Sequence, residues 1–138
     1  MSRLLIDLHP LFQPVAELIL GETQAKLGSS TVRPLSTFRT LAEQAAAKAG
    51  GASKLSLGFH NFGLAMDIGI ITPEGAYITN GADSRYKIYG EIAKAHGCTW
   101  GGDWIGFPDP AHCQMDGGLT ITEFVAWMRT HQINLGVS

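Results

Sequence analysis

Apolar residues recur at the spacing of a helix in four places along the chain. Side chains three and four positions apart fall on one helical face. The first three such segments lie at about residues 12–27, 37–49 and 84–96. Ser36 or Thr37 is expected to cap the second segment, and a fourth helix is expected after Thr120, which matches a capping box with Glu123. The core-facing stripe of the third helix is predicted to hold Ile88, Ile92 and Ala95.

Shorter apolar runs between the helices predict a small sheet. Candidate strands lie at residues 31–35, 64–71, 77–79 and 112–115. The run at 64–71 suits a central strand, and Pro34 limits the first strand to an edge. A turn at Pro73 would make 77–79 a hairpin partner of the central strand, and 112–115 could pair with it as well. Helices before and after such a sheet place the chain in the α+β class, with a small antiparallel sheet flanked by about four helices.

The length, net charge and cysteine content of the chain narrow the class of protein further. A chain of 138 residues suits one compact domain, which we expect to span residues 1–138. Its formal charge is -2 with no basic stripe, so nucleic acid is not an expected partner. The apolar run at 4–6 is too short for a membrane span or a signal peptide. The two cysteines form no C-x-x-C pair, so any metal site must use histidine and carboxylate ligands.

Candidate chemistry begins with Asp67 and His60. Asp67 lies within an apolar run, where an unpaired carboxylate would lose several kcal/mol of solvation. A structural salt bridge, a cap to a neighbouring loop or a bound cation would each satisfy it. His60 precedes a turn-like Asn-Phe-Gly, which lets the chain bend and bring the imidazole over Asp67. Each residue alone is more often structural, but together they form a possible half-site for zinc.

A second group of candidate residues follows the third helix. His112 heads a predicted strand, which would turn His112 to one face and Cys113 to the other. Paired with the strand at 64–71, it would present His112 as a third ligand and leave one tetrahedral position for water. Asp109, held extended before a proline, could stand beside the metal as a base. The alternative is a turn aspartate that caps the residues after it.

Four motifs follow one another along the chain: Phe38-Arg39-Thr40, His60-x-x-Gly63-x-Ala65-x-Asp67, Trp100-Gly-Gly-Asp-Trp104 and Asp109-x-x-His112-x-Gln114. In this order, these motifs resemble the M15 family of zinc peptidases, which includes L-alanyl-D-glutamate endopeptidases of phage lysins and D-alanyl-D-alanine carboxypeptidases. The resemblance covers about residues 30–115, and Cys113 departs from it where relatives often have an aromatic residue. Some relatives also have Glu in place of Asp109.

The resemblance implies both a fold and a set of residue roles. The fold would be hedgehog/D,D-peptidase-like, with one Zn²⁺ bound by His60, Asp67 and His112. Asp109 would be the general base. Arg39 would bind the substrate carbonyl or the developing oxyanion, a role that suits the fixed charge and donor fork of a guanidinium.

The expected function on this resemblance is a zinc metallopeptidase that hydrolyses peptidoglycan stem peptides. It would act as an L-alanyl-D-glutamate endopeptidase of the phage or prophage endolysin type. A D-alanyl-D-alanine carboxypeptidase or dipeptidase is the nearest alternative, because it would use the same metal chemistry. A non-catalytic zinc-stabilised cell-wall-binding module is the alternative from another class. We expect a monomer that is cytoplasmic at synthesis, since no signal peptide is seen, and that acts on the wall after release.

Overall fold

The fold is organised around a strand whose only polar side chain is that of Asp67. The computed structural model describes residues 1–51 and 57–131, and β2 (Ala65–Ile71) lies in the interior of its sheet. The strand order is β1-β2-β4-β3, and every neighbouring pair is antiparallel. The predicted central strand and the pairing of 112–115 with it are confirmed, and the strand with Pro34 lies at an edge. The other three strands are β1 (Thr31–Ser36), β3 (Thr99–Trp100) and β4 (His112–Gln114).

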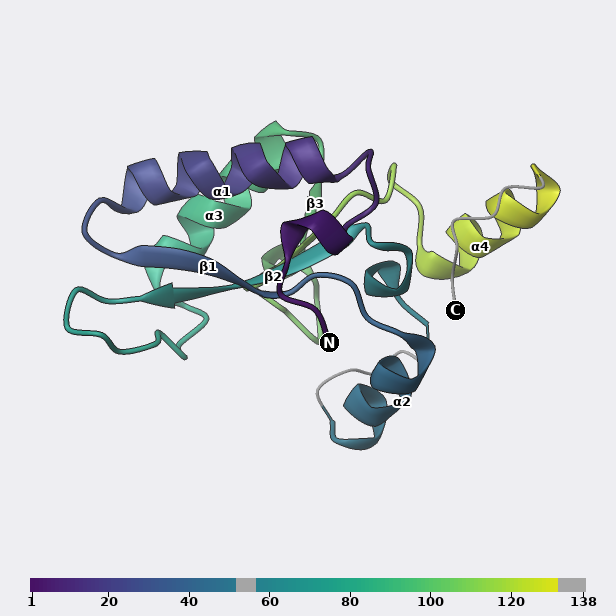
Figure 1. Cartoon of the computed structure of the whole chain (residues 1–138), viewed down its shortest axis with the longest axis horizontal. Helices are drawn as coiled ribbons and strands as arrows, with labels where there is room; N and C mark the ends of the chain where they lie inside the picture. The colour runs from purple at the N-terminus through teal and green to yellow at the C-terminus, as the bar shows by residue number, and fades with distance from the viewer. Residues whose placement is uncertain (52–56, 132–138) are drawn as a thin grey trace.

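Two helices, α1 (Gln13–Leu27) and α3 (Ser84–Ala95), pack against each other and against the sheet (Figure 1). α1 contacts β1 and α3 contacts β3, so the pair spans the sheet from one edge strand to the other. Fully buried Phe12, Ile19 and Tyr89 join these helices to the core. Residues 1–51 and 57–131 contain four α-helices and a small antiparallel sheet, which confirms the α+β class.

The stripe that α3 buries differs from the predicted one. Tyr86 and Tyr89 face inward, because each ring fills the core while its hydroxyl donates to a backbone carbonyl, 2.6 Å from Ile78 O and 3.2 Å from Met66 O. The prediction was wrong because it considered only the spacing of aliphatic residues and left out the tyrosines. The residues expected at the core are half-buried Ile88 and Ile92 and exposed Ala95.

The segment before α2 (Leu41–Ala49) is extended, which corrects the predicted cap of this helix. Ser36 is the last residue of β1, and the carbonyl of Thr37 accepts a hydrogen bond from His60, so neither residue caps a helix. Thr40 is the N-cap instead and forms a capping box with Glu43. Strand pairing of Ser36 and the contact of Thr37 with a distant histidine therefore override the local preference of these residues for a cap.

A hairpin partner at 77–79 does not form as predicted. The turn after Pro73 is present, with Gly75 N donating to Thr72 O. Beyond it, Tyr77 makes an isolated bridge to Ile71 in place of a strand. β1 and β4 are the strands that pair with β2, and the segment after Tyr77 leads directly into α3.

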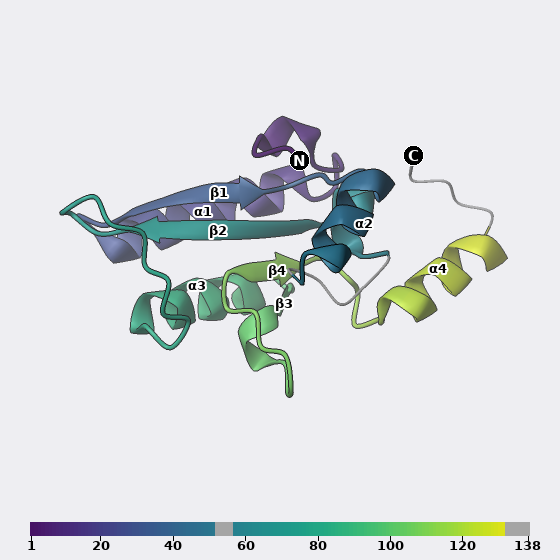
Figure 2. The ribbon, with the colours of Figure 1, turned by 90° about the horizontal axis from the view of Figure 1, so that it is seen from below.

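α4 (Ile121–Thr130) begins with the predicted capping box of Thr120 and Glu123. Its Phe124 lies between Phe59 and Phe62, with ring centroids 5.1 and 5.2 Å away. Those two phenylalanines belong to the short 3-10 helix η2 (Phe59–Phe62). α2 and α4 both stand at the end of the sheet where β2 begins and β4 ends (Figure 2). α4 therefore supports the turn that carries His60.

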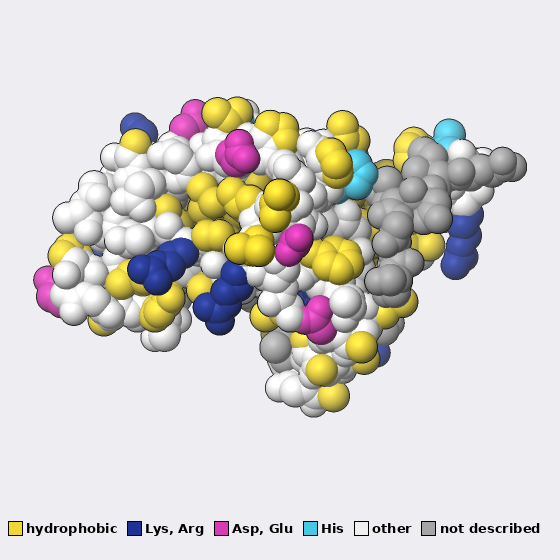
Figure 3. Space-filling view, in the orientation of Figure 1, with side chains coloured by type: hydrophobic (Ala, Val, Ile, Leu, Met, Phe, Trp, Pro, Cys, Tyr) yellow, Lys and Arg dark blue, Asp and Glu magenta, His cyan; other side chains and the backbone are white. Residues whose placement is uncertain are grey.

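The surface carries its charges in small groups of both signs. On the face shown in Figure 3, Lys and Arg are interspersed with Asp and Glu and form no single stripe. Within the described part of the chain, no helix has the length and apolar character needed to cross a membrane.

Candidate metal centre and active site

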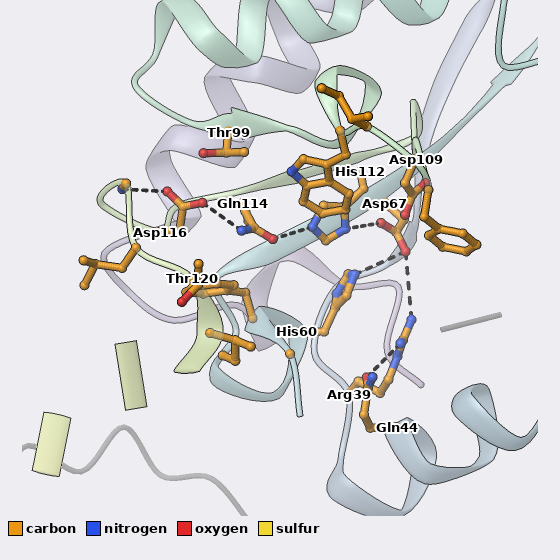
Figure 4. A pocket seen from close by; sticks show the side chains of 18 residues that line it. Arg39, Gln44, His60, Asp67, Thr99, Asp109, His112, Gln114, Asp116 and Thr120 are labelled. Carbon is orange, nitrogen blue, oxygen red and sulfur yellow. Dashed lines mark hydrogen bonds and ion pairs between the residues drawn. The ribbon is translucent and has the colours of Figure 1, made fainter. Parts of the chain in front are cut away.

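Three side chains from three elements meet at one end of the sheet. His60 comes from η2, Asp67 from β2 and His112 from β4 (Figure 4). One potential ligand atom from each lies within 4.8 Å of the other two. Nδ1 of His112 is 2.8 Å from Oδ1 of Asp67, and Nε2 of His60 is 3.2 Å from Oδ2 of the same carboxylate. The structure thus brings together the three residues that the sequence singled out as ligands.

Strand pairing and a tight turn place these side chains. Asp67 and His112 are direct partners in the antiparallel pairing of β2 with β4, so their side chains emerge side by side on one face. His60 is brought over them by η2, which ends at Gly63 with a φ of +69°. A Cβ at Gly63 would lie 2.6 Å from the backbone nitrogen of His9, so only glycine fits this turn.

The donor set of this cluster fits a cation. Nδ1 of His60 lies 2.7 Å from the carbonyl oxygen of Thr37 and donates to it in the neutral imidazole, which leaves a lone pair on Nε2. That Nε2 is buried and has no hydrogen-bond partner among the described residues, yet it faces the carboxylate of Asp67. A lone pair and a carboxylate repel unless a proton or a cation lies between them. Two imidazole nitrogens and one carboxylate form a ligand set that zinc accepts.

The charges of the cluster are strongly coupled. Burial alone would raise the pKa of Asp67, but the charge of His60 and the hydrogen bond from His112 hold it well below its usual range. Burial would likewise lower the pKa of His112, but the hydrogen bond and charge of Asp67 raise it. Asp67 is therefore ionised, as a metal ligand must be.

Asp109 lies on the same cavity as the cluster and next to Asp67 (Figure 4). Burial and the negative charge of Asp67 raise the pKa of Asp109, so its carboxylate is a stronger base than an exposed one. The backbone amide of Ala111 also bonds this carboxylate and lowers its pKa. Asp109 therefore has a turn contact of the kind considered as an alternative, and it faces the centre at the same time.

Arg39 reaches the cluster from the segment between β1 and α2. Its guanidinium lies 3.9 Å from Oδ2 of Asp67, and its side chain is 12% exposed. Nη1 donates to Oε1 of Gln44 at 2.9 Å, which orients the guanidinium toward the cavity. Gln44 was not among the predicted site residues.

The cavity has a volume of about 620 Å³ and extends from Arg39 past the histidines to the start of α4. One rim is apolar, because Trp104, Ile105 and Phe107 are exposed there, and the Trp104 ring centroid is 5.2 Å from that of His112. Trp100, at the other end of the Trp100-Gly-Gly-Asp-Trp104 motif, is buried against α3 and does not line the cavity. A polar centre with an apolar rim suits a peptide chain lying across the site.

Comparison with known proteins identifies the class of protein that carries this site. Residues 50–115 match a peptidase family of type M15 described as D-alanyl-D-alanine carboxypeptidase. The chain is 31% identical over 125 residues to the peptidoglycan L-alanyl-D-glutamate endopeptidase CwlK of Bacillus subtilis, an alignment that covers 79% of this chain and 74% of that protein. The chain therefore belongs to the M15 peptidase family, and the resemblance seen in the sequence is confirmed.

Other relatives agree with this assignment. The L-alanyl-D-glutamate peptidase of Listeria phage A118 is 37% identical over 82 residues, which are 58% of this chain and 28% of the phage protein. The crystal structure of the Serratia marcescens L-Ala D-Glu endopeptidase ChiX matches with a TM-score of 0.62 at 22% identity, over 87% of this chain and 86% of that one. The D,D-dipeptidase VanXYg matches with a TM-score of 0.52 at 19% identity, over 93% of this chain and 56% of that one. These two structures share the fold.

Proposed function

We propose that this peptidase hydrolyses the peptidoglycan stem peptide between L-alanine and D-glutamate, with one Zn²⁺ held by His60, Asp67 and His112. The observation that carries the proposal is the buried, unpartnered Nε2 of His60 facing Asp67 in a cavity that Asp109 and Arg39 also line, as seen among the described residues. A cation between these groups would relieve their repulsion.

Each of the residues around the metal would have a separate role in the reaction. A zinc ion bound here lowers the pKa of water and polarises a carbonyl. Asp109 takes the proton from the attacking water and passes it to the nitrogen of the leaving amine as the peptide bond breaks. Arg39 donates to the carbonyl oxygen, which becomes negative in the transition state. Gln44 holds the guanidinium of Arg39 for this task.

The choice of scissile bond is supported by the relatives. Both the Bacillus subtilis protein and the phage protein are named for the bond between L-alanine and D-glutamate. The family description and the VanXYg match favour the alternative, a D-alanyl-D-alanine carboxypeptidase or dipeptidase. The closer sequence similarity lies with the endopeptidases, so we place the chain with them. Action on the wall after release from the cytoplasm stays a prediction.

Mass spectrometry of digested peptidoglycan separates these activities. Purified wall from a Gram-negative bacterium, incubated with the zinc-loaded protein, should release peptides that begin with D-glutamate and leave L-alanine on the glycan. Release of free D-alanine would contradict the endopeptidase assignment and support the alternative. If the wall is bound but left intact, the chain is a binding module. The matched control is the Asp109→Ala variant, which should retain zinc and release nothing.

A further inference from the structure

A chain of side-chain hydrogen bonds runs outward from His112, away from Asp67. Nε2 of His112 lies 2.8 Å from Oε1 of Gln114, and Nε2 of Gln114 donates to Oδ2 of Asp116 at 2.8 Å (Figure 4). Oδ1 of Asp116 accepts from the backbone nitrogen of Gly118 at 2.8 Å. His112, Gln114 and Asp116 are all buried, with 7%, 8% and 7% of their surfaces exposed. A mismatched donor or acceptor in this chain would therefore be costly.

Asp116 sets the direction of each hydrogen bond between it and His112. Both oxygens of the Asp116 carboxylate accept hydrogen bonds, one from Gly118 and one from Gln114, so the amide of Gln114 turns its NH₂ toward Asp116. The carbonyl of Gln114 then faces His112 and accepts from an N–H at Nε2. With the proton at Nε2, Nδ1 of His112 presents its lone pair on the side of Asp67.

Without this constraint His112 would have a competing arrangement. The carboxylate of Asp67 lies 2.8 Å from Nδ1 and favours a proton on that nitrogen. A neutral imidazole with its proton at Nδ1 would offer no lone pair to a cation at the centre. Gln114, if reversed, would stabilise this arrangement by donating to Nε2. Asp116 prevents the reversal, because the carbonyl of Gln114 would then face the carboxylate.

The geometry points to Asp116 and Gln114 as positioning residues that keep the proton of His112 on Nε2 and leave Nδ1 free to bind the metal. The inference rests on the proposed function, since it takes His112 as a ligand. His60 has the opposite arrangement, because the carbonyl of Thr37 holds its proton at Nδ1 and leaves Nε2 for the centre. One histidine is therefore held by a backbone carbonyl, and the other by a pair of side chains that can be exchanged by mutation.

Exchanging the two functional groups tests the direction of the bonds without changing the shape of the side chains. Gln114→Glu places two carboxylates together, and Asp116→Asn leaves either Gln114 or the amide of Gly118 without an acceptor. In the double variant, the carboxylate introduced at position 114 accepts from His112 and from the amide introduced at position 116. The carbonyl of that new amide accepts from Gly118, so every bond is restored. Gln24→Glu is the matched control, because the amide of this α1 residue bonds the backbone of Ser30, outside the cavity.

Three measurements read the result. Zinc affinity, measured by competition with a chromophoric chelator, should fall about 10- to 100-fold in each single variant. The double variant should bind within about threefold of the parent, and Gln24→Glu should bind as the parent does. In ¹H–¹⁵N spectra of the zinc-loaded protein, a slowly exchanging Nε2 proton of His112 should be present in the parent and the double variant and lost in the single variants. In chelator, the denaturation midpoint should fall in the single variants and recover in the double variant.

The outcomes separate this inference from the proposed function. If His112→Ala loses zinc but both single variants bind it as the parent does, the positioning role is overturned and the metal site stands. If His112→Ala binds zinc unchanged, the metal site fails and the positioning role fails with it. Decreases in the denaturation midpoint that add in the double variant, with no recovery, would show that the two side chains do not act as a directed pair.

Discussion

Asp109 gains its basicity from its position. A carboxylate that is half-buried beside Asp67 binds a proton more readily than one in water, because burial and the neighbouring charge both disfavour ionisation and so raise its pKa. The same carboxylate lies beside the two histidines, whose positive forms oppose that effect. Position and charge together give a group able to take a proton from water and return it to an amine.

Replacement of Asp109 by Asn should lower kcat/KM by about 10²- to 10⁴-fold, the usual contribution of a general base. The amide keeps the shape of the side chain but cannot accept the proton. Zinc content should match that of the parent, because Asp109 is not among the proposed ligands. The control is Asp103→Asn, whose carboxylate pairs with Lys94 on the surface and should leave turnover unchanged. Equal rates for parent and Asp109→Asn would refute the proposed base.

The pH dependence of metal-free stability should report the pairing of His112 with Asp67. The folded state raises the pKa of His112, so this pairing stabilises the protein fully below the unfolded value of about 6.5. The contribution is lost as pH rises through the raised folded value. Urea unfolding in chelator should therefore give a free energy of unfolding that falls from about pH 6 upward. His112→Gln should flatten this part of the curve; an unchanged slope would contradict the pairing.

The amino-acid sequence predicted the candidate site residues better than it predicted the residues that hold them in place. His60, Asp67, His112, Asp109 and Arg39 were all singled out from the sequence, and all five line one cavity. Asp67 and Asp109 are polar residues in an apolar and a proline-bounded run, whereas Arg39 was singled out only through the resemblance to the M15 family. The supporting roles of Gln44, Gln114 and Asp116 were missed, since these roles depend on which way a side chain points after the strands have paired.

At the scale of elements, local signals predicted structure where no distant partner competed. The capping box at Thr120 gave the start of α4, and the apolar run at 64–71 gave β2. The start of α2 could not be predicted in this way, because the carbonyl of Thr37 accepts a hydrogen bond from His60, a residue far along the chain. The buried face of α3 was missed because tyrosine is polar by composition yet fills the core here.

Two helical glycines offer a matched test of element packing. A Cβ on Gly90 of α3 would lie 2.1 Å from Cδ2 of Trp100, whereas a Cβ on Gly21 of α1 would meet nothing within 4 Å. Gly90→Ala should destabilise the protein by about 1–3 kcal/mol through overpacking. Gly21→Ala should stabilise it by up to about 1 kcal/mol through helix propensity. Urea unfolding measures both, and a stabilising Gly90→Ala would contradict the tight packing.

Gly90→Ala should also affect catalysis. Nε1 of Trp100 donates to the carbonyl of Pro110 at 2.8 Å, and Pro110 follows Asp109 directly. Displacing the indole should move this loop, so Gly90→Ala should lower kcat/KM while Gly21→Ala leaves it unchanged.

At the scale of the whole molecule, the centre joins parts of the chain that are far apart. Its ligands come from η2, β2 and β4, and Asp67 and His112 are 45 positions apart. A metal bound only by the folded chain should raise the free energy of unfolding by about 2.7 kcal/mol when free zinc is about 100 times its Kd. Thermal unfolding with and without zinc should show the shift in the parent and in His131→Gln, and no shift in Asp67→Ala. A shift that survives in Asp67→Ala would place the metal elsewhere.

The direct pairing of Asp67 with His112 across β2 and β4 has a consequence for how the molecule matures. A slip of β4 by one position would invert its faces and present the thiol of Cys113 to the cleft in place of the imidazole. Under the proposed ligand set, such a molecule could not assemble the centre. The molar ratio of bound zinc to protein would then equal the fraction of molecules in which β4 has the correct register. Zinc content would therefore measure how much of a preparation of this enzyme is correctly folded.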